Sequence, residues 1–156
     1  MSIRELVEVE LGKDYGVLSR IHLMQLRELE PTERTAEELG YIFSFDPRVP
    51  MVTFYREKQH PLFPWYVIDN FHLIPNLPYW VEGSGLIDRY NGILRKPPSD
   101  VEREVIDVLA ERHKEIRLSV EYSHIENNQL IGISNREVQS VQELDDLLRN
   151  PPKDHR

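Results

Sequence analysis

Hydrophobic residues recur at helical spacing in two segments of the C-terminal third of the chain. Apolar side chains line one side of residues 100–114 and of residues 141–149. Ser99 and Ser140 stand immediately before these segments, and each has a glutamate three residues later, as in the capping box that starts many helices. The pattern therefore predicts two capped helices, near 100–114 and 141–149.

Strict alternation of apolar and polar residues predicts a β-hairpin between these two helices. Residues 116–122 alternate cleanly, which is typical of a strand with one face in water. Asn127 and Asn128 suit a tight turn because asparagine tolerates positive φ. Residues 129–134 then return as the second strand of the hairpin.

The N-terminal third gives a mixed pattern. Residues 3–11 alternate between apolar and charged side chains, which predicts a half-buried strand, and residues 41–46 predict another. Residues 17–29 place apolar side chains on several faces, and the pattern favours a helix that ends near Pro31.

Three PxxP motifs recur at intervals of 14 residues, beginning at Pro47, Pro61 and Pro75. A fixed period is typical of a repeated supersecondary unit, and 14 residues suit one strand with its connection. Chance matches among eight central prolines, or a polyproline ligand for a partner, are the alternatives. The predicted strands lie near 51–57, 65–69 and 79–82.

Together these elements predict an α+β fold. We expect a mostly antiparallel sheet of about six to eight short strands, with the two capped helices packed on one face and a third helix indicated near 17–29. Regular strand–helix–strand alternation is absent, which argues against a parallel sheet. The chain is predicted to form one globular domain over residues 1–150, followed by a polar tail at 151–156.

The composition excludes several classes of protein but adds no element to the predicted fold. Leu, Ile, Val and Phe make up 48 of the 156 residues, which is enough to build a core and excludes general disorder. The chain has no cysteine, so disulfide scaffolds, thiolate catalysis and thiolate metal sites are excluded. No apolar run approaches 18 residues, and we expect a soluble cytoplasmic protein.

Charge points to the class of partner. The net charge is −8, and residues 51–98 are nearly neutral between two acidic flanks. An acidic chain binds nucleic acid poorly because non-specific affinity for phosphates depends on Lys and Arg. The expectation is therefore a basic protein partner, with no direct nucleic-acid or membrane binding. Acidity that serves only solubility is the alternative.

Nine of the 14 aromatic residues lie within residues 51–98, and they supply the candidate binding residues. Aromatic pairs at successive positions place one ring on each face of a strand, and only one face can be buried in the core. Since Trp and Tyr dominate binding hot spots, the exposed rings are candidates for a partner surface. The alternative is that all of them pack in the core. The predicted partner-binding residues are Trp65, Tyr66, Tyr79 and Trp80.

Histidines and carboxylates give only one candidate catalytic set. His60, Asp69 and His72 have the composition of a metal-binding facial triad, although their spacing is not the short spacing usual for one. Glu121 and His124 flank the predicted hairpin turn and could pair as acid and base. No local motif has metal-ligand spacing, so no metal and no cofactor are predicted.

These observations favour a non-enzymatic acidic binding protein that engages, and in one version inhibits, a basic macromolecular partner. Residues 136–150 resemble the ends of several small bacterial immunity proteins, in which a strand is followed by a capped, leucine-rich helix; this resemblance implies inhibition of a toxin or nuclease. One alternative is a small hydrolase or metal-dependent enzyme that uses His60, Asp69 and His72. The other is a structural or assembly subunit that associates with itself.

Overall fold

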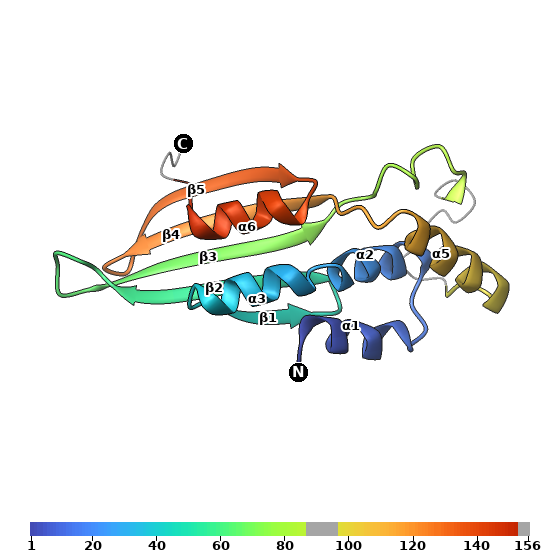
Figure 1. The fold of residues 1–156 in the computed structure, drawn as a ribbon, viewed down its shortest axis with the longest axis horizontal. Helices are drawn as coiled ribbons and strands as arrows, with labels where there is room; N and C mark the ends of the chain where they lie inside the picture. Colours follow the sequence, from blue (N-terminus) through green and yellow to red (C-terminus); the bar gives the residue numbers. More distant parts are fainter. Residues whose placement is uncertain (87–96, 153–156) are drawn as a thin grey trace.

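A five-stranded antiparallel sheet is the centre of the fold in the computed structural model, which describes residues 1–86 and 97–152. Strands that follow one another in the sequence are also neighbours in the sheet, so the sheet is a simple meander (Figure 1). The strands are β1 (Ile42–Asp46), β2 (Met51–Gln59), β3 (Tyr66–Pro75), β4 (Leu118–Glu126) and β5 (Gln129–Val138).

The described helices form two groups. In Figure 1, α3 and α6 lie across the sheet, whereas α1, α2 and α5 gather at one end of it. The first pair contact each other and the edge strands β1 and β5, and α2 contacts both α1 and α5. None of the described helices has the length and apolar character needed to cross a bilayer. The helices are α1 (Ile3–Leu11), α2 (Val17–Arg27), α3 (Glu30–Glu38), α5 (Asp100–Arg112) and α6 (Val141–Arg149).

The two faces of the sheet have different environments. The inner face is the one that carries Phe54, Phe71 and Tyr122 and the side chains in register with them. These side chains enter the hydrophobic core together with Leu144 and Leu148 of α6. The outer face consists of the alternate positions, in register with Thr53, His72 and Glu121. No described residue of the outer face belongs to the buried core, so the molecule has two layers.

The predicted fold class is confirmed in its main features. The protein is α+β, its sheet is antiparallel, and the helices expected near 17–29, 100–114 and 141–149 are present as α2, α5 and α6. The described residues contain five strands rather than six to eight. Only α6 packs on the sheet as expected, because α5 lies beyond the end of the sheet against α2. Of the predicted tail, residues 153–156 lie outside the described residues.

The strand predicted over residues 3–11 is wrong, because this segment forms helix α1. The side chain of Ser2 accepts a hydrogen bond from the backbone N–H of Glu5 and caps the helix. Ile3, Val7 and Leu11 are buried at helical spacing, whereas Val9 is 55% exposed. In an alternating pattern, every second apolar residue is four positions from the next. Residues four positions apart also lie on the same side of a helix, so the pattern fits both structures.

The strand predicted at 79–82 is also wrong, because this segment forms turns. The backbone N–H groups of Val81 and Glu82 donate to the carbonyls of Pro78 and Tyr79, three residues earlier. The first two PxxP motifs lie in the connections on either side of β2, and the third begins at Pro75, the last residue of β3. The 14-residue interval between the PxxP motifs therefore matches the spacing of successive strand connections for the first two motifs only.

Candidate functional site

The outer face of the sheet is left uncovered by the described helices. It combines branched apolar side chains with short polar ones and carboxylates, and most of these side chains are half-buried or exposed. The outer-face residues of β1 to β4 are Ile42, Ser44, Asp46, Met51, Thr53, Tyr55, Glu57, Gln59, Tyr66, Ile68, Asn70, His72, Ile74, Ser119, Glu121, Ser123 and Ile125, and those of β5 include Ile133, Asn135 and Glu137.

The charges of the outer face are unbalanced. Arg117 at the start of β4 forms ion pairs with Glu82, at 2.7 Å, and with Glu137, at 3.2 Å. Hydrogen bonds from Gln139 and Arg117 hold the pKa of Glu137 below its ordinary value. Within residues 1–86 and 97–152, neither Glu57 nor Glu121 forms an ion pair with a cationic side chain. The face is therefore acidic.

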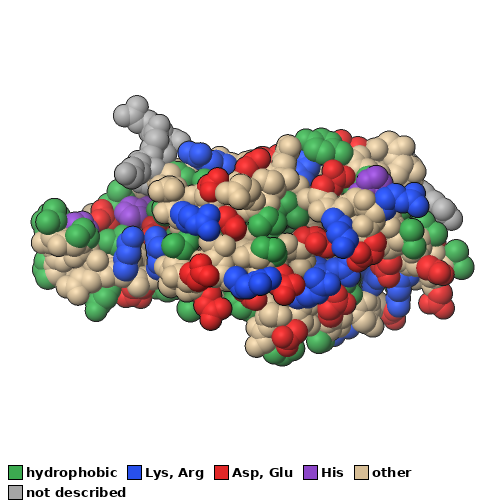
Figure 2. Space-filling view, viewed as in Figure 1, with side chains coloured by type: hydrophobic (Ala, Val, Ile, Leu, Met, Phe, Trp, Pro, Cys, Tyr) green, Lys and Arg blue, Asp and Glu red, His purple; other side chains and the backbone are tan. Residues whose placement is uncertain are grey.

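The helical side of the molecule has a different charge pattern. Figure 2 views this side, where acidic and basic side chains interleave over the helices. Arg27 of α2, for example, forms ion pairs with Glu8 at 3.4 Å and with Glu111 at 2.8 Å. Several carboxylates on this side are thus offset by neighbouring guanidinium groups, whereas others, such as Glu38 and Glu104, are exposed and form no ion pair within the described residues.

Two of the predicted binding residues lie at opposite ends of the outer face. Tyr66 begins β3 and is 56% exposed. Tyr79 follows β3, is 50% exposed, and lies under the guanidinium of Arg117, whose carbon is 4.3 Å from the ring centre. Since β3 has ten residues, its ends are about 30 Å apart. The two rings could anchor the two ends of a partner that covers the face.

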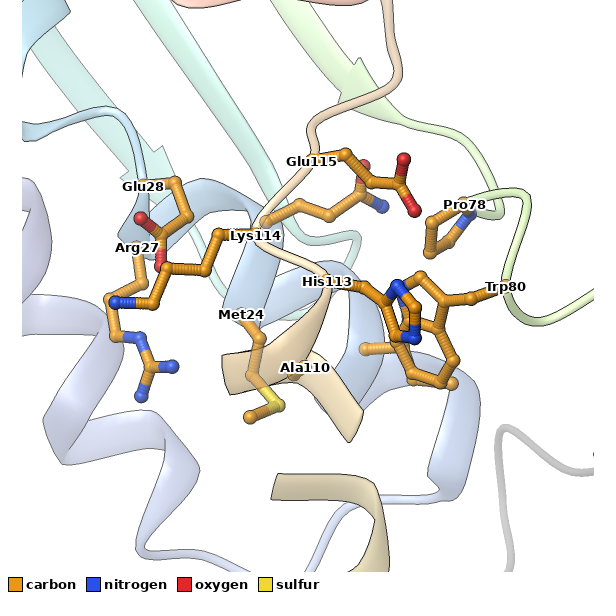
Figure 3. A pocket seen from close by; sticks show the side chains of 11 residues that line it. Met24, Arg27, Glu28, Pro78, Trp80, Ala110, His113, Lys114 and Glu115 are labelled. Atoms are coloured by element: carbon orange, nitrogen blue, oxygen red, sulfur yellow. The ribbon is translucent and has the colours of Figure 1, made fainter. Parts of the chain in front are cut away.

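The two tryptophans lie elsewhere. Trp65 stacks on Phe63 in the β2–β3 connection, with ring centres 4.4 Å apart, and is half-buried there. Trp80 is half-buried beside α5 and stacks on His113 at 6.2 Å (Figure 3). The structure therefore separates the four predicted residues into pairs at the two ends of β3 and does not gather them into one patch.

The cavity beside Trp80 is too small to be a substrate site. It lies between α2, α5 and the turn after β3, and its volume is about 10 Å³, the space of about one water molecule. Figure 3 shows that Lys114 extends toward Arg27 and Glu28, away from the stacked rings of Trp80 and His113. This region is best described as a packing contact between α2 and α5.

A buried polar cluster on the inner face is the most connected set of titratable groups. The carboxylate of Asp69 accepts hydrogen bonds from the Tyr122 hydroxyl at 2.6 Å and from Arg56 at 2.9 Å, and lies 3.0 Å from Nδ1 of His124. Burial acts to raise the pKa of Asp69, but these hydrogen bonds and the charge of Arg56 together hold it below its ordinary value. Asp69 is therefore a buried carboxylate ion.

This cluster also joins the sheet to the helices that cover it. Arg56 donates to the carbonyl of Leu39, directly after α3, and its guanidinium lies 4.3 Å from the ring centre of Tyr41. The hydroxyl of Tyr41 in turn donates to the carbonyl of Leu148 in α6, at 3.1 Å. Each side chain in this series of contacts is held by a residue from another helix or strand, which supports a structural role for the cluster.

His60 and Glu126 interact near the cluster but do not form a metal site. The backbone N–H groups of Leu62 and Phe63 donate to Nδ1 of His60, at 3.0 and 3.2 Å. Nε2 of His60 must then carry the proton that it shares with Glu126, 3.1 Å away. A protonated nitrogen cannot ligate a metal, and the described residues contain no group of three side chains that could hold one.

The structure does not bring together the candidate catalytic set. Asp69 points to the inner face, whereas His72 points to the outer face, where Nδ1 is 2.9 Å from the Thr53 hydroxyl. His60 lies at the end of β2. Glu121 and His124 also occupy opposite faces of β4. Among the described carboxylates, Asp69 on the neighbouring strand lies nearest to His124. Only the strand register, which the sequence does not reveal, could have indicated that pair.

Fold and site together define a two-layer α+β protein with an uncovered, acidic sheet face. Comparisons with protein-family models, with curated proteins and with solved structures found no match.

Proposed function

We propose that this protein is a non-enzymatic binding protein that engages a basic protein partner through the outer face of its sheet. The observation that carries the proposal is the uncovered face with uncompensated carboxylates at Glu57 and Glu121. Complementary charge accelerates association and disfavours wrong partners. Half-buried isoleucines between the carboxylates supply apolar area, and Tyr66 and Tyr79 supply rings at both ends.

The same charges argue against an assembly subunit that pairs its own outer faces. Two copies stacked in this way would bring Glu57 and Glu121 together, and Arg117, at the end of the described outer face, already pairs with Glu82 and Glu137. Like charges at close range disfavour association. A partner with exposed Lys or Arg meets no such repulsion.

Inhibition by occlusion is the form of binding that this surface favours. An open sheet face about 30 Å long suits coverage of a partner's functional surface rather than enclosure of a small molecule. A cytoplasmic location is part of the proposal, because a chain without cysteine needs no oxidising compartment.

The test is affinity capture from the lysate of the native host with matched charge variants. The double variant Glu57→Gln/Glu121→Gln removes two carboxylates from the outer face. The control, Glu38→Gln/Glu104→Gln, removes two exposed carboxylates from α3 and α5. We expect wild type and control to retain the same basic protein at low salt, and the outer-face variant to retain at least fivefold less. High salt should weaken the capture because it screens exposed charges.

The proposal is overturned if wild type captures no protein at either salt concentration, or if both double variants lose the captured protein equally. Thermal unfolding of all three proteins should give the same transition temperature, since neither pair of residues lies in the core. Equal stability would assign a difference in capture to the surface rather than to misfolding.

A further inference from the structure

The two edges of the sheet differ in length and protection. β1 forms one edge, has five residues, and runs into the proline-containing turn at 47–50. β5 forms the other edge and has ten residues. No described strand pairs with its free side. A long edge presents a row of backbone N–H and C=O groups that can pair with another extended chain. β5 therefore offers a site of β-strand addition.

A groove follows the last residues of this edge. It lies between the end of β5 and the exposed side of α6, and its volume is about 550 Å³. Three of its lining residues are acidic, Glu137, Glu143 and Asp146, and one is basic, Arg136. The lining residues thus have a net charge of −2, as the difference between three carboxylates and one guanidinium. Glu137 also pairs with Arg117 and Asp146 with Arg149, whereas Glu143 forms no ion pair within the described residues.

Both faces of a strand added to β5 would meet carboxylates. Side chains on its inner side would enter the groove beside Glu143 and Asp146. Side chains on its outer side would lie near Glu137 and, one strand further, Glu121. Toward the β4–β5 turn, β5 exposes apolar residues instead, including Ile131 and Ile133. This distribution suits an extended segment with Lys or Arg residues and apolar residues between them.

We propose that the free edge of β5 and the groove beside α6 bind an extended, lysine- or arginine-bearing segment of the partner as a sixth strand. The inference rests on the proposed function, because it identifies which part of the basic partner is recognised. Backbone hydrogen bonds to β5 supply affinity for an extended chain, and the carboxylates of the groove select its charge.

A synthetic peptide of eight alternating lysine and valine residues is the probe. We expect it to slow the exchange of backbone amide hydrogens in β5 and to leave those of β1 unchanged, since new hydrogen bonds protect the amides that form them. A peptide of alternating glutamate and valine is the control for charge, and it should protect neither edge.

Charge variants in the groove provide the second measurement. Glu143→Gln/Asp146→Asn should weaken binding of the lysine peptide about fivefold, because two exposed charge pairs contribute modestly. The control Asp100→Asn/Glu104→Gln changes the same residue types on the exposed side of α5 and should leave binding unchanged. Both variants keep the size of each side chain, so the fold should be retained.

Three results would overturn the inference. The lysine peptide could fail to protect β5, it could protect both edges alike, or β5 could be protected without peptide in a way that grows with protein concentration. The last result would show that a second copy occupies the edge. If the captured partner then still depends on Glu57 and Glu121, the proposed function stands and only its assignment to the β5 edge fails.

Discussion

The inner and outer faces of the sheet differ most clearly at neighbouring residues of β3. Phe71 points inward, is fully buried, and has the rings of Tyr41 and Tyr122 around it at 5.8 and 4.6 Å. His72 points outward, is half-buried, and contacts the hydroxyl of Thr53. One peptide bond thus separates a side chain that the fold requires from one that it does not.

The same contrast holds for carboxylates. Asp69 on the inner face has three hydrogen-bonding partners, whereas Glu121 on the outer face forms no ion pair within the described part of the chain. A buried charge must be satisfied internally, because leaving it unpaired is costly. An exposed carboxylate is satisfied by water and can exchange water for a partner. The inner face therefore holds the polar contacts that stabilise the fold, whereas the carboxylates of the outer face remain in contact with solvent.

A substitution in the core on the inner face should cause the largest loss of stability. Phe71→Ala should lower the free energy of unfolding by about 4 kcal/mol, because it removes a buried aromatic ring and leaves a cavity between Tyr41 and Tyr122. His72→Ala, one residue further, should lower it by less than about 1 kcal/mol. Urea unfolding of both variants measures the difference.

Equal losses in the two variants would contradict the assignment of faces. If Phe71→Ala does not fold, the milder Phe71→Leu keeps the test usable, since it should still cost more than His72→Ala.

The second effect concerns the buried cluster. Asp69→Asn should lower the free energy of unfolding at pH 7 by about 3 kcal/mol, because it removes the negative charge that Arg56 faces at 2.9 Å. The control Glu57→Gln, which removes an outer-face carboxylate from the same sheet, should change the free energy of unfolding by about 0.5 kcal/mol or less.

The pH dependence of this difference has a definite sign. The pKa of Asp69 is lower in the folded state than its ordinary value, so the stabilisation is complete above about pH 5, where the carboxylate is also ionised in the unfolded chain. It is lost as the pH falls through the lower folded pKa. The gap between wild type and Asp69→Asn should therefore be constant from pH 5 to pH 7 and narrow below pH 4. A gap that widens on acidification would contradict the ion pair.

Local signals in the sequence predict much of the fold. Ser99 and Ser140 do begin α5 and α6, and the Ser99 cap forms a complete capping box with Glu102. Asn127 and Asn128 do adopt positive φ in the β4–β5 turn, at 51° and 61°. Such signals act over a few residues, so the sequence displays them directly.

The errors arise where packing decides. Ile3, Val7 and Leu11 fit a strand and a helix equally, and the contact of α1 with α2 selects the helix. Pro31, taken as the end of a helix, instead lies in the first turn of α3, where proline is well tolerated. The pairing of Asp69 with His124 depends on the register of β3 against β4, which joins residues 55 positions apart. The geometry of the site therefore depends on contacts between residues that are far apart in the sequence.

The smallest change in stability is expected for a substitution on the outer face of β5, compared with the same substitution on the inner face of that strand. Ile133 and Val138 both lie on β5, but Ile133 is paired with the outer-face residue Ser123 and is 46% exposed, whereas Val138 is paired with the inner-face residue Leu118 and is 3% exposed. Ile133→Thr should change the free energy of unfolding by less than about 0.5 kcal/mol, because threonine keeps the β-branch and its hydroxyl remains in water. Val138→Thr should cost about 1.5 kcal/mol, because it buries the same hydroxyl. Thermal and urea unfolding at two protein concentrations measure both. If Ile133→Thr cost as much as Val138→Thr, and more so at the higher concentration, a second copy would cover the outer face in solution, and the contrast between the two faces would belong to the single chain only.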